Sequence, residues 1–259
     1  MFDEVSATYD STGIDFFGQI ARTLVEYARL REGARVLDVG CGAGAALIAA
    51  SEIVGHTGRV IGIDLASGMV ERARRAAREL ALENVQVQVG DAEAPPIDSF
   101  SVDAIVSSLV LFFLPNIGLA LDAFAQRLAV GGTLAFSSFV GEDDWTPLDR
   151  LLATFTRAPP TAQEDAWFES RDGIRAVLHT HGFHQVSIEE VTHHIEFPDV
   201  TSFHEWGWST GWRTAWQAIP AEHRETARAA VDEYLQSVEK QRGCLRLATA
   251  IRYTRAETT

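Results

Sequence analysis

Short apolar runs alternate with amphipathic stretches between residues 35 and 140 of the chain. The runs have the length and composition of buried strands, and the stretches between them carry apolar residues at helical spacing. The strands are predicted at residues 35–39, 60–63, 85–89, 102–106 and 133–139. The helices are predicted at residues 43–54, 68–82 and 117–128. Strands that alternate with helices in this way predict crossover connections and a parallel sheet that is covered on both faces.

The rest of the chain extends this pattern at both ends. Apolar residues at helical spacing predict a helical lead-in, and we assign residues 1–34 to an N-terminal lid. After residue 140 we predict an acidic insertion at residues 142–163, a helix at residues 171–181, a strand at residues 184–197, an aromatic-rich helical segment at residues 201–240 and a last strand at residues 244–255. We therefore expect an α/β fold with a doubly wound, mostly parallel, seven-stranded Rossmann-like sheet. Residues 35–140 form its core, and residues 141–259 supply the rest of the sheet and a helical, aromatic-rich cap.

Composition and charge narrow the class of partner. A chain of 259 residues is long enough for one large domain with a sizeable core. The formal net charge of −14 argues against a polyanionic partner such as nucleic acid, which requires a basic surface. The acidic N-terminus lacks the apolar segment of a secretory signal, and no apolar run is long enough to cross a bilayer, so we expect a cytoplasmic protein with no membrane partner. Cys41 and Cys244 lack metal-ligand spacing, and we expect no metal.

The strongest chemical signal is the sequence VLDVGCGAG at residues 36–44. An apolar strand here runs into a glycine turn and then into a helix, so that a ligand can approach the backbone at the carboxyl end of the strand. The glycines alone are ambiguous, because Gly40, Gly42 and Ala45 also fit the pattern of dinucleotide-binding proteins. Asp38 separates the two possibilities, since its carboxylate suits a ligand with an ammonium and a sulfonium group and would repel a pyrophosphate.

Two further strand ends carry carboxylates that indicate the same kind of ligand. Asp64 ends the second predicted strand, where an acidic side chain can accept hydrogen bonds from both hydroxyls of a ribose. Gly90, Asp91 and Ala92 follow the third predicted strand and can bring a carboxylate to an adenine amino group. Three strand ends therefore converge on an adenosine that carries no phosphate.

Taken in order, these motifs resemble those of a known family. The segments VLDVGCGAG, GIDLASGMVERAR, GDAEAPP, SVDAIVSSLVLFFLPN and AVGGTLAFSSF look like successive motifs of the class I S-adenosylmethionine (SAM)-dependent methyltransferases. The resemblance covers about residues 35–140 and is closest to the branch of the ubiquinone/menaquinone-pathway enzymes and many small-molecule tailoring methyltransferases. Residues 2–10 resemble the FD…YD lead-in of that branch. The resemblance implies SAM as cofactor, S-adenosyl-L-homocysteine (SAH) as product, and a tailoring reaction of secondary metabolism on a small, largely apolar acceptor.

The resemblance also implies roles for individual residues. The cofactor contacts that it implies are, in chain order, Asp38, Gly40, Cys41, Gly42, Gly44, Asp64, Leu65, Met69, Gly90, Asp91, Ala92 and Ser107. Within this set Asp64 would hold the ribose, Asp91 would take the adenine amino group, and Ser107 would face the methionyl end through its backbone. Leu65 and Met69 would pack on the adenine, although both also suit a purely structural place in the core, and Asp91 also suits a turn cap.

A proton acceptor would assist methyl transfer to a hydroxyl or to a carbon acid. The candidates for this role are Tyr9, in the predicted lid, together with His194 and His204. His193 precedes His194 on a predicted strand, so the two rings point to opposite faces and at most one of them reaches a pocket. Many members of the resembling branch carry a His pair after the fourth strand, where this chain has Phe112.

The acceptor site is predicted in the aromatic-rich cap and in the segment after the fourth strand. Its candidate residues are Phe112, Trp206, Trp208, Trp212 and Arg213. Trp208, Trp212 and Trp216 repeat at every fourth position, which on a single helix would form one continuous aromatic face. That face would either line an apolar acceptor pocket or pack the cap onto the core.

Three other functions are compatible with parts of the sequence. An enzyme can keep SAM or SAH in place and catalyse different chemistry, such as a cyclisation, because the cofactor and acceptor sites are separable. A nicotinamide (NAD(P))-dependent oxidoreductase is disfavoured by Asp38 and by the later motifs. A SAM-sensing or scaffold protein is disfavoured, because the glycine loop is intact and is followed by a cap large enough to enclose a ligand. The expected partner is a small-molecule acceptor, and we expect a monomer or a homodimer.

Overall fold

The structure is a computed structural model that describes residues 9–10, 12–99, 101–141, 143–156 and 167–259. Residues 2–8 of the predicted lead-in (residues 2–10), and residues 142 and 157–163 of the predicted insertion, lie outside the described residues. No helix within the described ranges has the length and the apolar composition needed to cross a membrane.

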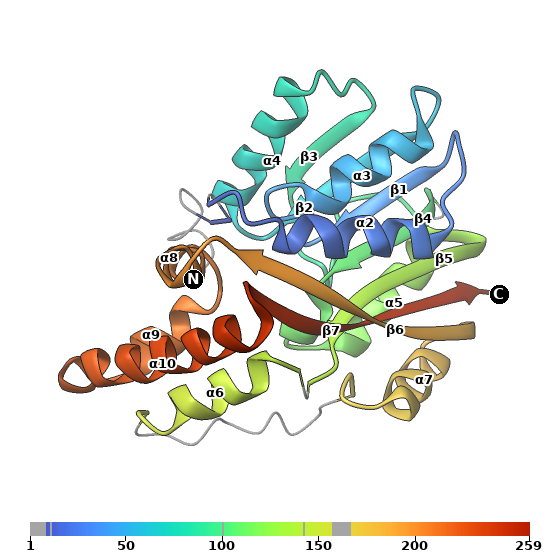
Figure 1. Ribbon diagram of the computed structural model, residues 1–259. Coiled ribbons are helices and arrows are strands. Elements are labelled where there is room, and N and C mark those ends of the chain that lie inside the picture. The colour runs from blue at the N-terminus through green and yellow to red at the C-terminus, as the bar shows by residue number, and fades with distance from the viewer. Residues whose placement is uncertain (1–8, 11, 100, 142, 157–166) are drawn as a thin grey trace.

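Across the described ranges, seven strands form one sheet in the order β3-β2-β1-β4-β5-β7-β6 (Figure 1). Their bounds are β1 Arg35–Val39, β2 Arg59–Asp64, β3 Val85–Val89, β4 Val102–Ser108, β5 Leu128–Phe139, β6 Phe183–Phe197 and β7 Leu245–Thr258. Strands β1 to β5 run parallel, whereas β7 pairs antiparallel with both β5 and β6. The expected doubly wound sheet is confirmed, with an antiparallel pair at one edge. The strand order reverses between β1 and β4, and sheets of this kind bind ligands there, outside the carboxyl ends of the strands.

Helices cover both faces of the sheet, because successive residues of a buried strand point to opposite sides. One face carries α2 Phe16–Ala28, α3 Ala45–Val54 and α4 Ser67–Glu79. The core between these helices and the sheet includes the strand residues Val36 and Ala104. The other face carries α5 Ile117–Arg127 and α7 Arg171–Thr180. The core on this side includes the strand residues Leu37 and Ile105. The helices predicted at residues 43–54, 68–82, 117–128 and 171–181 are confirmed, and their ends differ by up to three residues.

Strand β5 begins at Leu128, well before its predicted start at residue 133. Gly131 and Gly132 look like a turn in the sequence, but they lie inside the strand. The register between β4 and β5 shifts between Val102 and Ala104, and Gly131 has a positive φ of 69°. An irregularity of this kind lets a strand continue through glycines that would otherwise end it.

The cap consists of α6 Trp145–Ala153, α8 Val200–Ser209, α9 Arg213–Ala218 and α10 Arg224–Arg242, which gather at one side of the sheet (Figure 1). The segment predicted to be helical over residues 201–240 is confirmed as helical, but it is divided into α8, α9 and α10. Thr210 adopts an extended backbone after α8, with φ −122° and ψ −175°, and Gly211 follows it. Ile219 is extended as well, because a residue before proline avoids the helical region and Pro220 comes next. The chain therefore changes direction twice within the predicted helix.

Candidate functional site

A cavity of 440 Å³ opens at the carboxyl ends of β1, β2, β3 and β4. The glycine loop, the ends of β2 and β3, the turn after β4 and the N-terminal segment form its walls. The predicted site residues that line it are Tyr9, Asp38, Gly40, Cys41, Gly42, Asp64, Leu65, Met69, Gly90, Asp91 and Ala92. The three strand ends that the sequence predicts to converge therefore do meet around one cavity.

The glycine turn after β1 is shaped by backbone angles that glycine adopts easily and other residues do not. Gly40 and Gly42 have positive φ angles of 67° and 52°. A Cβ atom on Gly40 would lie 2.6 Å from both Cγ atoms of Val110, in the turn after β4. Gly44, with φ of 103°, is the N-cap of α3 and lies behind the cavity wall, towards Ala73 of α4. The turn thus brings the ends of β1 and β4 together with no room for a side chain at Gly40.

Replacing Gly40 by Ala should destabilise the ligand-free protein more than replacing Gly42 by Ala. Both changes place a side chain at a positive φ angle, which costs about 1–2 kcal/mol. A Cβ on Gly42 meets no atom within 4 Å, whereas one on Gly40 also collides with Val110, and overpacking adds about 1–3 kcal/mol. Thermal unfolding should therefore give a Tm several degrees lower for Gly40→Ala than for Gly42→Ala. Equal Tm values would show that Val110 moves aside without loss.

The carboxylate of Asp64 is fixed by the backbone on both sides of it. Its Oδ2 accepts a hydrogen bond from the Gly42 amide at 2.9 Å, and its Oδ1 accepts one from the Ala66 amide at 2.8 Å. The Gly90 amide donates to the Asp64 carbonyl oxygen at 3.0 Å and ties the end of β3 to the same point. Two backbone amides therefore hold the Asp64 carboxylate in one orientation at the cavity.

Asp38 is a buried carboxylate that makes no hydrogen bond of normal geometry to any described residue. The residue is 1% exposed, and neither of its side-chain oxygens accepts a hydrogen bond. Burial and, second, the charge of Asp64 raise the pKa of Asp38 from 3.8 to about 7; the Leu47 amide, which approaches the carboxylate outside normal hydrogen-bond geometry, lowers it in part. A buried charge without a partner is unfavourable. The site therefore fits a ligand whose cationic group would pair with Asp38.

Asp91 and Leu65 form another part of the cavity wall. Asp91 Oδ1 accepts a hydrogen bond from the Glu93 amide at 2.9 Å, and Asp91 forms a short β-bridge with Ala94. Asp91 thus caps the turn after β3, which was the structural alternative, and it also lines the cavity. Leu65 is 74% exposed at the cavity, where a flat ligand could cover it, whereas Met69 is buried on α4.

Ser107 does not reach the cavity. Its side chain is fully buried, and its hydroxyl donates to the Val39 carbonyl oxygen at 2.9 Å. Ser108 and Leu109 line the cavity instead. Leu109 has a positive φ of 57°, an unfavourable conformation for leucine, and its amide donates to Ser137 Oγ at 3.0 Å. The sharp turn after β4 therefore places the residues that follow Ser107 at the cavity, not Ser107 itself.

The N-terminal segment borders the cavity between α4 and the cap. Tyr9 stacks on Phe17 with 5.4 Å between ring centroids, and its carbonyl oxygen accepts a hydrogen bond from Arg72 of α4. The Asp10 amide donates to the Ser209 carbonyl oxygen, at the end of α8, at 3.1 Å. The segment is therefore connected to α4 on one side and to the cap on the other.

Asp10 is a cavity residue that the sequence does not single out. Its Oδ1 is buried and has no hydrogen-bond partner among the described residues. Burial raises the pKa of Asp10 to about 7, while the charge of Arg72 lowers it and that of Asp15 adds to the rise. Burial and the charges of Asp10 and Asp64 also raise the pKa of Tyr9, so this phenol is a poor proton acceptor near neutral pH. The YD pair of the lead-in was the available signal, but only the fold shows that Asp10 lines the cavity.

The predicted histidines do not line this cavity. His193 and His194 point to opposite faces of β6, as predicted: His193 is buried, with Nε2 2.7 Å from the Tyr253 hydroxyl, and His194 is exposed. His204 is buried in the cap, with Nε2 2.6 Å from Asp232 Oδ1. The placement of His194 and His204 therefore gives no support to a role in proton transfer. In the described ranges no group of three or more His, Cys, Asp or Glu side chains could hold a metal ion either.

Two of the predicted acceptor residues belong to the core of the cap. Trp206 is 4% exposed and packs against Phe16 and Trp145, with 5.1 Å and 5.3 Å between ring centroids. Trp212 stands between α8 and α9, and its Nε1 donates to Asp149 of α6 at 3.1 Å. Both side chains hold the cap onto α2 and α6, which agrees with the packing alternative.

The remaining acceptor candidates are divided between the outside of the cap and the cavity mouth. Trp208 is 39% exposed and lies outside the cavity, as does Arg213, the first residue of α9. The continuous aromatic face predicted for the cap is wrong, because the chain turns between α8 and α9. Phe112 lies near the cavity, since its ring centroid is 4.5 Å from that of Phe113, which lines it.

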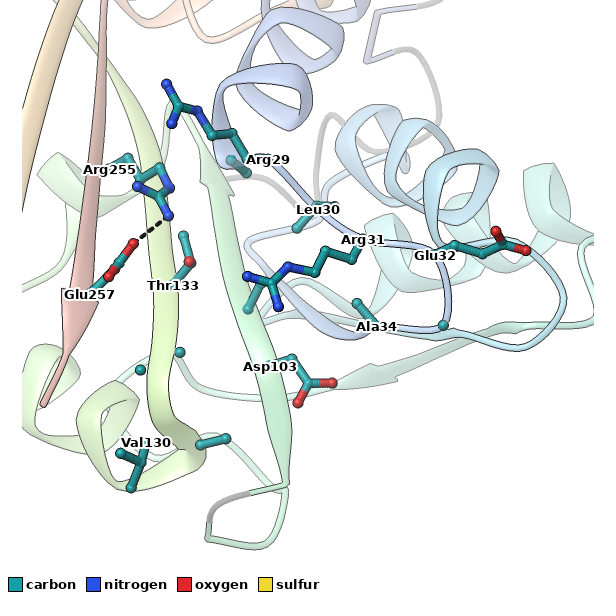
Figure 2. Close-up of a pocket in the computed structure, with 16 residues that line it drawn as sticks. Arg29, Leu30, Arg31, Glu32, Ala34, Asp103, Val130, Thr133, Arg255 and Glu257 are labelled. Atoms are coloured by element: carbon teal, nitrogen blue, oxygen red, sulfur yellow. Dashed lines mark hydrogen bonds and ion pairs between the residues drawn. The ribbon is translucent and has the colours of Figure 1, made fainter.

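A larger cavity, of 690 Å³, lies at the opposite end of the parallel strands. Figure 2 shows that its walls carry charges of both signs, among them Arg29, Arg31 and Asp103, and that Arg255 pairs with Glu257. It is bounded by the segment before β1 and by the starts of β4 and β5. None of the predicted site residues lines this larger cavity, so the smaller one, at the carboxyl ends, is the candidate site.

Several known proteins resemble the chain in sequence or in fold. A family described as "Methyltransferase domain" matches residues 30–197. Aklanonic acid methyltransferase DauC of Streptomyces sp. (strain C5) is 45% identical over 137 residues, which cover 53% of this chain and 62% of that protein. Nocamycin O-methyltransferase of Saccharothrix syringae is 30% identical over 249 residues, which cover 88% of this chain and 87% of that protein. The crystal structure of a SAM-dependent methyltransferase from Aquifex aeolicus matches the fold with a TM-score of 0.56 and 24% identity, over 73% of this chain and 90% of that one.

Proposed function

The chain belongs to the class I SAM-dependent methyltransferases, and within this family we propose that it methylates an oxygen atom of a small, largely apolar metabolite. The observation that carries the proposal is the buried, unpartnered carboxylate of Asp38 beside a glycine turn with no room for a side chain at Gly40. A ligand with adenosine at one end and a cationic amino acid at the other suits both features. Transfer to oxygen is supported by the relative that is named as an O-methyltransferase.

The described residues fit SAM part by part. Asp38 would pair with the ammonium group of the methionyl end, Asp64 would accept hydrogen bonds from the ribose hydroxyls, and Asp91 would take the adenine amino group. Leu65 would lie against the adenine ring. When bound, SAM supplies an electrophilic methyl group on a sulfonium sulfur.

The contribution of the chain to methyl transfer is to align the acceptor and to exclude water. Tyr9 and Phe17 stand at the cavity from the N-terminal side and would shield it. Asp10 is our candidate for the proton acceptor, because it lines the cavity and its buried Oδ1 has no partner. A carboxylate with a pKa of about 7 is well suited to act as a base near neutral pH. Tyr9, whose pKa is raised, would serve as a hydrogen-bond donor to cofactor or acceptor.

Calorimetric titration with SAH tests the cofactor site, with NADH and NADPH as controls. We expect SAH to bind and the nicotinamide cofactors not to bind. Asp64→Ala should weaken SAH binding about ten- to a hundredfold, because hydrogen bonds to a charged group contribute about 1.5–3 kcal/mol. Asp172→Ala, whose carboxylate is 99% exposed on α7, is the matched control and should leave the affinity unchanged. Binding of NADH or NADPH in place of SAH would overturn the assignment.

Incubation with methyl-labelled SAM and with phenolic or carboxylic acid acceptors then tests the reaction. Label in the product establishes methyl transfer, and hydrolysis of the labelled product identifies the methylated oxygen. A rearranged product without label would instead indicate chemistry such as cyclisation and would contradict the proposal.

A further inference from the structure

Four phenylalanine rings cluster at the mouth of the cofactor cavity. We call this cluster the aromatic shelf; it consists of Phe112 and Phe113 in the 3₁₀ turn η1 (Leu111–Phe113), Phe139 at the end of β5 and Phe168 just before α7. Phe112 is its centre, with 4.5 Å to the ring centroid of Phe113, 5.7 Å to that of Phe139 and 5.5 Å to that of Phe168. Residues from three separate parts of the chain thus form one aromatic surface.

Part of the aromatic shelf faces solvent. Phe113 is 58% exposed and Phe139 is 41% exposed, although large apolar side chains are usually buried. Apolar side chains that are exposed together commonly mark a binding site. Phe113 also lines the cofactor cavity, so the aromatic shelf begins where that cavity opens. A molecule on the shelf would therefore lie next to the bound cofactor.

The aromatic shelf is supported from behind by buried contacts. The Phe168 carbonyl oxygen accepts a hydrogen bond from Arg252 Nη1 at 2.6 Å. Arg252 is itself buried, and its Nε lies 3.0 Å from Glu190 Oε1 of β6. Trp167 packs between Phe168 and Phe136, with 5.8 Å between ring centroids in both pairs. A surface held in place in this way loses little freedom when a ligand binds, which favours affinity.

We propose that the aromatic shelf is the acceptor site and that it selects a flat, fused-ring aromatic molecule; this inference rests on the proposed function. Aromatic rings attract each other through offset-stacked and edge-to-face contacts, so phenyl rings recognise other rings better than flexible chains of similar apolar area. The rings of Phe113 and Phe139 are tilted by 49° and 56° to that of Phe112, so a fused-ring system can stack on one ring and contact a second edge to face, whereas a single ring spans less of the cluster. No lysine, arginine or histidine is among the described residues that line the adjoining cavity. A ligand that extends from the aromatic shelf into that cavity would therefore meet no cationic side chain among these lining residues.

Trp208 provides a matched comparison for the aromatic shelf. Its exposed fraction of 39% is almost equal to the 41% of Phe139. Trp208, however, lies on α8 beside His204 and Arg228, in a groove that shares no lining residue with the cofactor cavity. If exposed aromatic area alone attracted an acceptor, replacing Trp208 and replacing Phe139 would have the same effect.

Anthraquinone-2-carboxylate is the probe for this test, titrated by calorimetry into the full chain saturated with SAH. We expect Phe112→Ala and Phe139→Ala each to weaken its binding about fivefold to tenfold, since an aromatic pair contributes about 1 kcal/mol. Trp208→Ala should leave the affinity unchanged, and all three variants should bind SAH as the wild type does. Decanoate, which carries its carboxylate on a flexible chain, should bind more weakly than the ring compound. If Phe112→Ala unfolds, Phe112→Leu removes the ring and keeps apolar volume.

Three results would overturn the inference: no binding of the ring compound to the SAH-saturated protein, unchanged affinity in the Phe112 and Phe139 variants, or decanoate binding as tight as that of the ring compound. An equal loss in Trp208→Ala would overturn it as well. Because SAH binding is measured on the same samples, these failures leave the proposed function intact. Absence of SAH binding would instead remove the proposed function.

Discussion

Replacing Asp38 by Asn is expected to weaken SAH binding about a hundredfold or more, because removing one partner of a buried ion pair costs about 3–5 kcal/mol. Both oxygens of Asp38 are buried and without a partner, so a cationic ligand group would find its counter-ion there. Asn has nearly the same shape, and its side chain leaves the glycine turn and Asp64 in place. The loss would therefore report the charge and not a change of fold.

The same substitution should make the ligand-free protein more stable above pH 7. The pKa of Asp38 is about 7 in the folded state and has its ordinary value of 3.8 in the unfolded chain. Between these two values the folded protein keeps a proton that the unfolded chain releases, so stability falls as the pH rises through this window and stays low above it. Asn carries no charge and avoids this loss. We expect the Tm of ligand-free Asp38→Asn to exceed that of the wild type by several degrees at about pH 8 and to match it near pH 4.

The affinity of the wild type for SAH should follow the same ionisation. An ammonium group pairs with the ionised carboxylate only, so affinity should rise with pH up to about 7 and then level off, changing by up to about tenfold per unit below that value. Calorimetry at several pH values on wild type and Asp38→Asn checks this, and the dependence should be much weaker in the variant. Unchanged SAH affinity in Asp38→Asn would show that this carboxylate does not meet the cofactor.

Replacing Trp206 by Ala is expected to reduce the free energy of unfolding by about 3–5 kcal/mol, the usual loss for a buried tryptophan. Its ring is packed among Phe16, Trp145 and Phe197, whose centroids lie 5.1 Å, 5.3 Å and 5.7 Å away. Trp208→Ala, on the same helix but 39% exposed, should change the free energy of unfolding by less than about 1 kcal/mol. The two substitutions remove the same side chain, so they isolate the effect of burial.

Thermal and urea unfolding of both variants measure this difference, and the Tm of Trp206→Ala should fall by roughly 10 °C. The acceptor interpretation of Trp206 makes the opposite prediction: stability close to that of the wild type together with weaker acceptor binding. If Trp206→Ala unfolds at the wild-type temperature, the side chain is not a core residue of the cap.

Much of the fold and of the cofactor side of the site follows from local patterns. The apolar runs of β1, β2 and β3 predict parallel strands, and the carboxyl ends of neighbouring parallel strands meet at one edge of a sheet. Asp38, Gly40 and Asp64 stand at or next to those ends, so their convergence around one cavity needs no knowledge of distant contacts. Ser107 shows the limit of this reasoning, because the alternation along β4 and the sharp turn at Leu109 decide which residue reaches the cavity.

The proposed acceptor site depends mainly on the tertiary structure, although Phe112 was predicted from the sequence. Tryptophans at every fourth position lie on one face only if a single helix runs through all of them. Here the chain turns at Thr210 and again before Pro220. Phe112, Phe139 and Phe168 lie far apart in the sequence, and their meeting depends on how β4, β5 and the segment before α7 pack together. The sequence by itself therefore determined that the proposed cofactor residues stand at strand ends, since the glycine turn and the carboxylate that follows each apolar run are local features. Which aromatic side chains come together at the proposed acceptor site depended on long-range packing, which no local pattern encodes.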